Sequence, residues 1–149
     1  MKHAWFVDPT KEINMENSVR QLQPEQTTSF DTEYIDKDMF NILTKQLDML
    51  YPTNRPFHLL DVGGGNGLYA DKILSRYPDS KVTLVEPEES LLNKNRSHPN
   101  KSVKCAQFQD LKLDSTYDII QFNWVLHHFV SSSYKSTFEL QLQALQKAH

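Results

Sequence analysis

Every glycine of this 149-residue chain lies in one short loop beside an acid. The stretch Leu59–Gly67 reads LLDVGGGNG, and it holds all four glycines just after Asp61. Glycine is used where the backbone turns with positive φ or where a ligand approaches it closely. One glycine would suffice for a tight turn without a ligand, so four together favour a ligand site. The pattern predicts a ligand held by bare backbone next to a carboxylate.

The spacing of the glycines indicates which ligand the loop would take. A dinucleotide fingerprint, G-x-G-x-x-G, fails in both registers because Leu68 and Asn66 stand where its missing glycines would be. The loop instead reads D-x-G-x-G-x-G, starting at Asp61. A carboxylate there would repel a pyrophosphate and attract a cationic group such as an ammonium. We therefore expect a ligand that carries positive charge, and a nicotinamide enzyme is the least favoured alternative.

A second acid, Glu86, ends the next apolar run, in the stretch TLVEPEE. Its place after the glycine loop suits a carboxylate that accepts hydrogen bonds from ribose hydroxyls, as in nucleotide-binding α/β folds. The alternative is an exposed surface glutamate. Glu86 is thus a candidate ribose-binding residue.

Two adjacent histidines, His127 and His128, follow an apolar run near the end of the sequence. Neighbouring residues on a helix point about 100° apart, so we expect these two not to share one metal ion. The sequence has no Cys or His cluster with zinc spacing, and we predict no metal site. One of the pair is a candidate base for a hydroxyl acceptor, the alternative being a capping or packed histidine.

The elements that must position these residues follow from hydrophobic periodicity. Residues 36–50 place apolar side chains at helical spacing, namely Met39, Ile42, Leu43, Leu47 and Leu50. Short apolar runs predict strands over residues 57–62, 81–87, 102–108 and 117–122. Helices are predicted over residues 68–77 and 88–97, and a last helix begins at serines 131–133 and continues through Phe138, Leu142 and Leu145. Strands that alternate with helices favour a parallel α/β sheet with right-handed crossovers.

The acid–glycine loop and the later VLHH, residues 125–128, resemble motifs of the class I S-adenosylmethionine-dependent methyltransferases. The stretch DVGGG is similar to the loop of small-molecule O-methyltransferases. The resemblance implies an α/β, Rossmann-like fold, a parallel sheet flanked by helices with strand order 3-2-1-4, and strands 5–7 of the family fold would be missing. It divides the chain into an N-terminal arm, residues 1–35, and an S-adenosylmethionine-binding methyltransferase domain, residues 36–149.

The same resemblance implies roles for particular residues around S-adenosylmethionine. Glu86 would bind the ribose, and Asp110 the adenine amine, with Gln109 sharing that role and Leu111 packing on the base. Asn123 would lie beside the methionine part, and His127 and His128 are the catalytic candidates. The predicted cofactor-binding residues are Asp61, Gly63, Gly64, Gly65, Asn66, Glu86, Pro87, Gln109, Asp110, Leu111 and Asn123.

The predicted function is methyl transfer from S-adenosylmethionine to a small-molecule acceptor, by O- or N-methylation. The alternatives are a tRNA or protein methyltransferase and a non-catalytic S-adenosylmethionine-binding module. A net charge of −3 and a pI of about 6.0 disfavour nucleic acid as a partner. The single cysteine, Cys105, fits a reducing compartment, and no stretch has transmembrane length, so we expect a cytoplasmic protein without a membrane partner.

The fourth predicted strand raises the question of what covers it. In the order 3-2-1-4 it would form an edge of the sheet, and an uncovered apolar edge tends to pair with another chain. Two expectations follow: the chain is a fragment of a longer protein, or a second copy covers the edge of residues 117–122 in a dimer.

Overall fold

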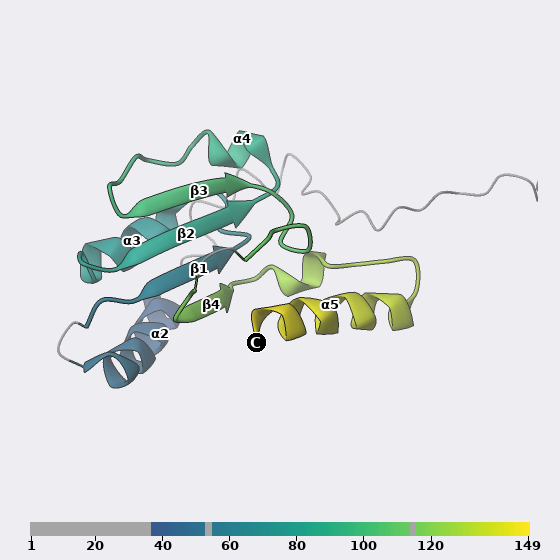
Figure 1. Cartoon of the computed structure of the whole chain (residues 1–149), viewed down its shortest axis with the longest axis horizontal. Helices are drawn as coiled ribbons and strands as arrows, with labels where there is room; N and C mark the ends of the chain where they lie inside the picture. The colour runs from purple at the N-terminus through teal and green to yellow at the C-terminus, as the bar shows by residue number, and fades with distance from the viewer. Residues whose placement is uncertain (1–36, 53–54, 114–115) are drawn as a thin grey trace, which may run out of the picture.

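A four-stranded parallel sheet forms the centre of the molecule (Figure 1). The computed structural model describes residues 37–52, 55–113 and 116–149. The strands are β1 (His58–Val62), β2 (Lys81–Glu86), β3 (Lys101–Cys105) and β4 (Ile119–Phe122). Their order is β3-β2-β1-β4, and every neighbouring pair is parallel. The Rossmann-like fold class and the predicted strand order are confirmed, whereas the predicted arm, residues 1–35, lies outside the described residues.

Five predicted strand boundaries differ from the structure, and two of them are wrong by two residues or more. The third strand ends at Cys105, three residues before the predicted Phe108. Beyond it the backbone turns, because the N–H of Leu111 donates to the Gln107 carbonyl. The fourth strand begins at Ile119, two residues later than predicted. The side chain of Asp118 instead accepts a hydrogen bond from the His58 N–H, which brings β4 alongside β1.

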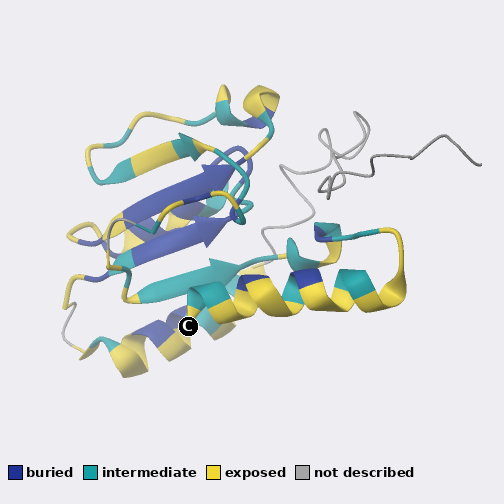
Figure 2. Cartoon of the chain, turned by 45° about the vertical axis from the view of Figure 1, so that its right-hand side comes forward, coloured by how far each residue is buried: buried dark blue, intermediate teal, exposed yellow. Residues whose placement is uncertain are grey.

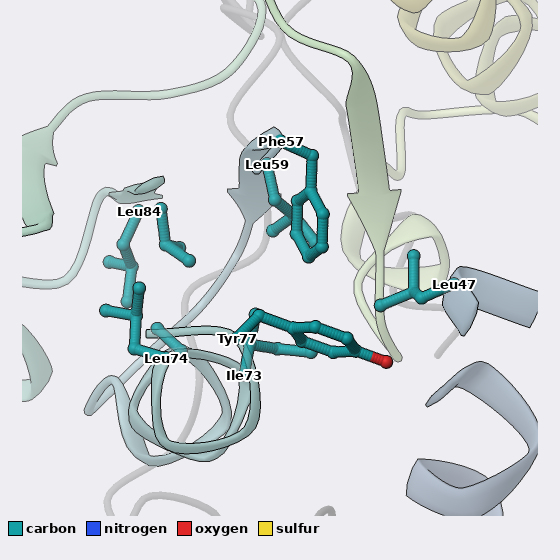
Figure 3. Packing of buried hydrophobic residues seen from close by; sticks show 9 residues of the cluster. Leu47, Phe57, Leu59, Ile73, Leu74, Tyr77 and Leu84 are labelled. Atoms are coloured by element: carbon teal, nitrogen blue, oxygen red, sulfur yellow. The ribbon is translucent and has the colours of Figure 1, made fainter. Parts of the chain in front are cut away.

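Helices cover both faces of the sheet (Figures 1 and 2). They are α2 (Lys37–Leu50), α3 (Leu68–Arg76), α4 (Glu89–Leu92), the short 3₁₀ helix η2 (Leu126–His128) and α5 (Tyr134–Ala148). The core between α2, α3 and the sheet is shown in Figure 3 and includes Leu47, Phe57, Leu59, Ile73, Leu74, Tyr77 and Leu84. A second core on the other face joins α5 to the sheet through Leu60, Val62, Val85, Phe108, Phe129, Leu140 and Ala144.

The helix predicted over residues 36–50 is present, but its buried face differs from the predicted one. Three residues of the expected apolar stripe are at least half exposed: Met39, Ile42 and Leu50. The face toward the core contains Phe40, Leu43, Thr44 and Leu47, which follow the same i, i+3, i+4, i+7 spacing one register away. The polar Thr44 is tolerated there because its hydroxyl donates to the Asn41 carbonyl at 3.1 Å.

The last helix begins where the serines predicted, and a capping box fixes its start. Ser133 Oγ accepts from the Ser136 N–H at 3.1 Å, and Ser136 Oγ accepts from the Ser133 N–H at 3.2 Å. The apolar residues named along its sequence, Phe138, Leu142 and Leu145, are exposed, while Leu140 and Ala144 face the sheet. Helix α5 therefore carries an apolar stripe on its outer side (Figure 2).

Candidate functional site

The glycine loop lies at the carboxyl end of β1 and leads directly into α3 (Figure 1). The Gly63 N–H donates to the Val85 carbonyl at 2.7 Å, which holds the loop against β2. At Gly63 and Gly67 φ is +71° and +77°, a conformation that side chains disfavour. A Cβ would also overlap Val125 at the first position and the Asn95 amide at the second. Both positions thus need glycine for internal packing, whether or not a ligand is bound.

Gly64 is also packed against the protein itself. A Cβ there would lie 2.7 Å from Asp61 Oδ2 and 2.6 Å from Leu84 Cγ. Two residues further on, Asn66 uses its Oδ1 to accept from the Leu68 N–H at 3.2 Å and so helps to start α3. Their predicted cofactor contacts remain predictions.

Asp61 is buried in the sheet, and one of its two carboxylate oxygens lacks a donor. Its residue is 1% exposed, and Oδ2 has no hydrogen-bond partner among the residues that the structure describes. Burial and, to a smaller extent, the nearby charge of Glu86 together raise the pKa of Asp61 to about 7. A buried acceptor without a donor is costly, and a group that brings a donor or a positive charge would offset that cost.

Glu86 ends β2 and ties that strand to the loop. Its Oε2 accepts from the Gly65 N–H at 3.2 Å, and its Oε1 accepts from the Glu88 N–H at 3.0 Å. Burial raises its pKa, although both backbone hydrogen bonds act in the opposite direction. Since Glu86 is only 6% exposed, the alternative of a surface glutamate is wrong. Pro87, which follows it, is exposed.

The turn after β3 presents a buried amide rather than a buried acid. Both side-chain polar atoms of Gln109, Nε2 and Oε1, are buried and without a hydrogen-bond partner in the described part of the chain. Asp110 is exposed, and its N–H donates to the Gln107 carbonyl. Leu111 packs into the core beside the turn. Of the two polar residues predicted here to bind adenine, the buried Gln109 lacks hydrogen-bond partners, whereas Asp110 is exposed to water.

Helix η2 and the residues beside it follow β4, and they contact the glycine loop at Gly63. Trp124 has a φ of +55°, which is unusual for a bulky residue, and the next residue, Val125, packs on Gly63. The rings of His127 and His128 lie close together, with centroids 3.9 Å apart and planes inclined by 42°. They belong to the 3₁₀ helix η2 and not to a regular α-helix. That they do not share one metal ion stays a prediction. Asn123 is half-buried at the end of β4.

A group behind the loop was missed by sequence reasoning. Lys101 Nζ forms a 2.6 Å ion pair with Asp71 Oδ1, and the Lys101 side chain is 1% exposed. Asn95 Nδ2 donates to the Gly65 carbonyl at 3.0 Å. These three residues come from β3, α3 and the α4–β3 connection, so no local pattern could have grouped them.

Gln121 and Tyr69 form a second missed group next to Asp61. Gln121 is the register partner of Asp61 on β4, and its Oε1 is buried without a hydrogen-bond partner among the described residues. Burial raises the pKa of Tyr69 to about 12, and a side-chain hydrogen bond links Tyr69 to Gln121. A glutamine inside an apolar strand was the available sequence signal.

Two kinds of feature are absent from the described residues. No three His, Cys, Asp or Glu side chains are grouped there so as to hold a metal ion. In the same ranges, no helix has the length and apolar character needed to span a membrane.

The fold and the site define a Rossmann-like domain of the class I methyltransferase type. Residues 60–149 match the family described as Methyltransferase domain, which is more than half of the chain. The chain therefore belongs to this family of class I S-adenosylmethionine-dependent methyltransferases.

Curated relatives and solved structures were compared with the chain. Over 98 residues it is 28% identical to a malonyl-[acyl-carrier protein] O-methyltransferase of Bacillus anthracis, covering 61% of this chain and 36% of that protein. A protein of the same name from Acetivibrio thermocellus is 26% identical, covering 64% and 34%. The chain thus spans about a third of the length of these relatives.

The solved structures share the fold at low sequence identity. The plantazolicin methyltransferase BpumL, solved with a substrate analogue and SAH, superposes with a TM-score of 0.63 at 16% identity, covering 84% of this chain and 47% of that one. The SAM-bound amino pentose methyltransferase from Micromonospora echinaspora gives a TM-score of 0.59 at 17% identity, covering 89% and 54%.

Proposed function

We propose that this domain binds S-adenosylmethionine at the carboxyl ends of β1 and β2 and serves in methyl transfer to a small-molecule acceptor. The observation that carries the proposal is the buried, unpaired Oδ2 of Asp61 beside the glycine loop. The unpaired amide of Gln109 is a second, separate match, because it offers one donor and one acceptor to the edge of an adenine. Family membership supports the same ligand.

Each residue has a proposed part in holding the cofactor. Asp61 would face its cationic methionine part, Glu86 its ribose, and Gln109 with Leu111 its adenine. The loop backbone at Gly65 would lie beside it. Asn66, Pro87, Asp110 and Asn123 remain proposed as neighbours of the same ligand.

The bound cofactor would supply a methyl group on a sulfonium, which is already a good leaving group. The work left to the protein is to hold donor and acceptor in line and to exclude water. A base is useful only where the acceptor has a proton to lose, and His127 or His128 is proposed for that task. No further catalytic group is required by this chemistry.

The acceptor is proposed to be a small molecule, methylated on oxygen or nitrogen. In support, the curated relatives are named for malonyl-[acyl-carrier protein], and the acidic pI of about 6.0 disfavours RNA. A non-catalytic S-adenosylmethionine-binding module is the second candidate, because the chain spans only about a third of those relatives. Product formation with candidate acceptors separates the two. A cytoplasmic location is proposed from the single cysteine.

Calorimetric titration with S-adenosylhomocysteine tests cofactor binding directly. The chain is expected to bind it, and Asp61→Asn and Gly65→Val are each expected to weaken that binding. Asp79→Asn, which changes an exposed aspartate, is the matched control. Absence of binding together with clear binding of NADH would end the assignment, and unchanged affinity in both variants would place the pocket elsewhere.

We also propose that a second copy of the chain covers the outer edge of β4. Within the described residues, β4 pairs with β1 alone, so its other edge is free for pairing. Light scattering at micromolar concentration is expected to give the mass of a dimer. A monomer would contradict the proposal.

A further inference from the structure

The last turn of α5 holds the turn that carries Gln109. Lys147 Nζ donates to the Phe108 carbonyl at 2.8 Å and to the Gln109 carbonyl at 2.7 Å. The same ammonium lies 5.2 Å from the centre of the Phe108 ring. Hydrogen bonds from a charged donor are the stronger kind, and this one joins two consecutive carbonyls of a short connection. Residues more than thirty positions apart in sequence are thereby fixed to each other.

This connection, residues 107–111, needs such support because no hydrogen bond among the described residues fixes the amide of the Gln109 side chain. Phe108 and Leu111 anchor it in the core, but the Gln109 side chain between them has both amide atoms buried and unpaired within the described residues. The cost of that arrangement is offset only when a ligand completes the hydrogen bonds. A ligand edge with one donor and one acceptor side by side, as in adenine, does so with one pair of bonds.

Helix α5 has a second polar contact of the same kind, which provides a comparison. Gln141 Nε2 donates to the Leu126 carbonyl at 3.0 Å and to the Phe129 carbonyl at 3.4 Å. Gln141 therefore holds the segment around η2, whereas Lys147 holds the segment around Gln109. Helix α5 thus supports two separate parts of the proposed site through these two residues.

We propose that Lys147 is a positioning residue for base recognition: it fixes residues 107–111 so that the Gln109 amide meets an adenine edge. This inference rests on the proposed function. Lys147 itself does not touch the ligand. It acts by holding the carbonyls of the two peptide groups that flank the Gln109 Cα in one orientation.

The test compares two probes by calorimetry on the full chain. S-adenosylhomocysteine presents the adenine amino group, and S-inosylhomocysteine replaces that group with an oxygen. The wild-type chain is expected to prefer the adenosyl probe. Lys147→Met keeps the aliphatic stem and removes the donors, and it is expected to reduce this preference about tenfold. Lys147→Arg, which keeps a multiple donor, is expected to retain most of it.

Gln141→Leu is the matched control, since it removes a comparable pair of contacts on the same helix face. It is expected to leave the preference between the probes unchanged. If Lys147→Met keeps the wild-type preference, or weakens both probes equally, the positioning role is refuted while the proposed function stands. If the wild-type chain binds neither probe, the proposed function itself fails. If Lys147→Met does not fold, Lys147→Gln, which keeps one donor group, replaces it. Lys147→Gln must then also reduce the preference for the adenosyl probe, by less than tenfold.

Discussion

The two sides of the sheet core differ in how far their surfaces are buried. Around β1 and β2 the packing is tight: Leu59, Ile73 and Leu84 are 0% exposed, and α2 and α3 cover that side. Around β4 no residue of the strand is fully buried. The contrast lies in the strands, because both covering helices expose four apolar side chains: Tyr134, Phe138, Leu142 and Leu145 on α5, and Met39, Ile42, Met49 and Leu50 on α2. The two sides share one sheet but not one degree of burial (Figure 2).

The candidate ligand-binding carboxylates and the residues that support the site lie on different sides of this comparison. The unpaired Oδ2 of Asp61 and the loop contacts of Glu86 belong to the tightly packed β1–β2 side. The β4–α5 side supplies the histidines and the supports of Lys147 and Gln141, while its outer surface is apolar and uncovered in the described chain. We therefore expect substitutions on the first side to cost stability and those on the outer surface of the second to cost little.

The largest effect is expected at Lys101. Lys101→Met removes the buried partner of Asp71, whose side chain is 22% exposed, and leaves a partly buried charge behind the glycine loop. Breaking a buried pair costs about 3–5 kcal/mol, and the loss is expected toward the lower end of that range. Urea denaturation followed by circular dichroism measures the loss. Lys112→Met, at an exposed lysine, is the control and should stay close to wild type. A loss below about 1 kcal/mol would mean that the loop does not depend on the pair.

Asp61 is expected to make stability depend on pH. Its pKa is about 7 in the folded chain and near 3.8 when unfolded, so between these values the folded state retains a proton that the unfolded state has lost. Stability therefore falls as pH rises through this window, by an amount on the order of 2–4 kcal/mol.

Asp61→Asn should remove most of that dependence. The free energies of unfolding of the wild-type chain and of the variant are measured near pH 5 and near pH 8. Near pH 8 the variant is expected to be more stable than the wild-type chain. The buried Glu86 is present in both, so the difference between the two slopes reports Asp61. Parallel slopes would contradict the raised pKa.

A smaller effect is expected at the start of α5. Ser133→Ala removes the side-chain acceptor of the capping box and should cost about 1 kcal/mol. Thermal unfolding gives the change, and Ser132→Ala is the neighbouring control. Equal melting temperatures for the two variants would show that α5 is held by its packing alone.

The smallest effect is expected on the outer face of α5. Phe138→Ser alters a side chain that is 54% exposed, and the unfolding free energy should stay within about 0.5 kcal/mol of wild type. Leu140→Ala, at the buried position two residues on, should cost at least about 2 kcal/mol. If Phe138→Ser costs as much as Leu140→Ala, the apolar stripe is covered in solution and the two sides of the molecule are more alike than they look.

Sequence patterns located most of the elements but not the faces that they bury. The four strands were predicted because short apolar runs and turn residues are local signals, whereas their order followed from the family resemblance. On α2 and α5 the predicted apolar residues proved to be partly exposed, because each helix has apolar side chains on more than one side and only docking selects among them. The site was predicted best where it is local, at the glycine loop, and least where it is assembled from distant segments, as at Lys101 and Gln121.

The sequence alone determined the α/β order, the acid–glycine loop and its membership in a known motif family, because each is encoded by residues that are neighbours in the chain. Tertiary structure decided that Asp61 is buried with one carboxylate oxygen lacking a donor, that Gln109 and not Asp110 turns inward, and that Lys147 supports that turn. Burial and pairing depend on which segments meet when the sheet closes, and that information is spread over the whole chain.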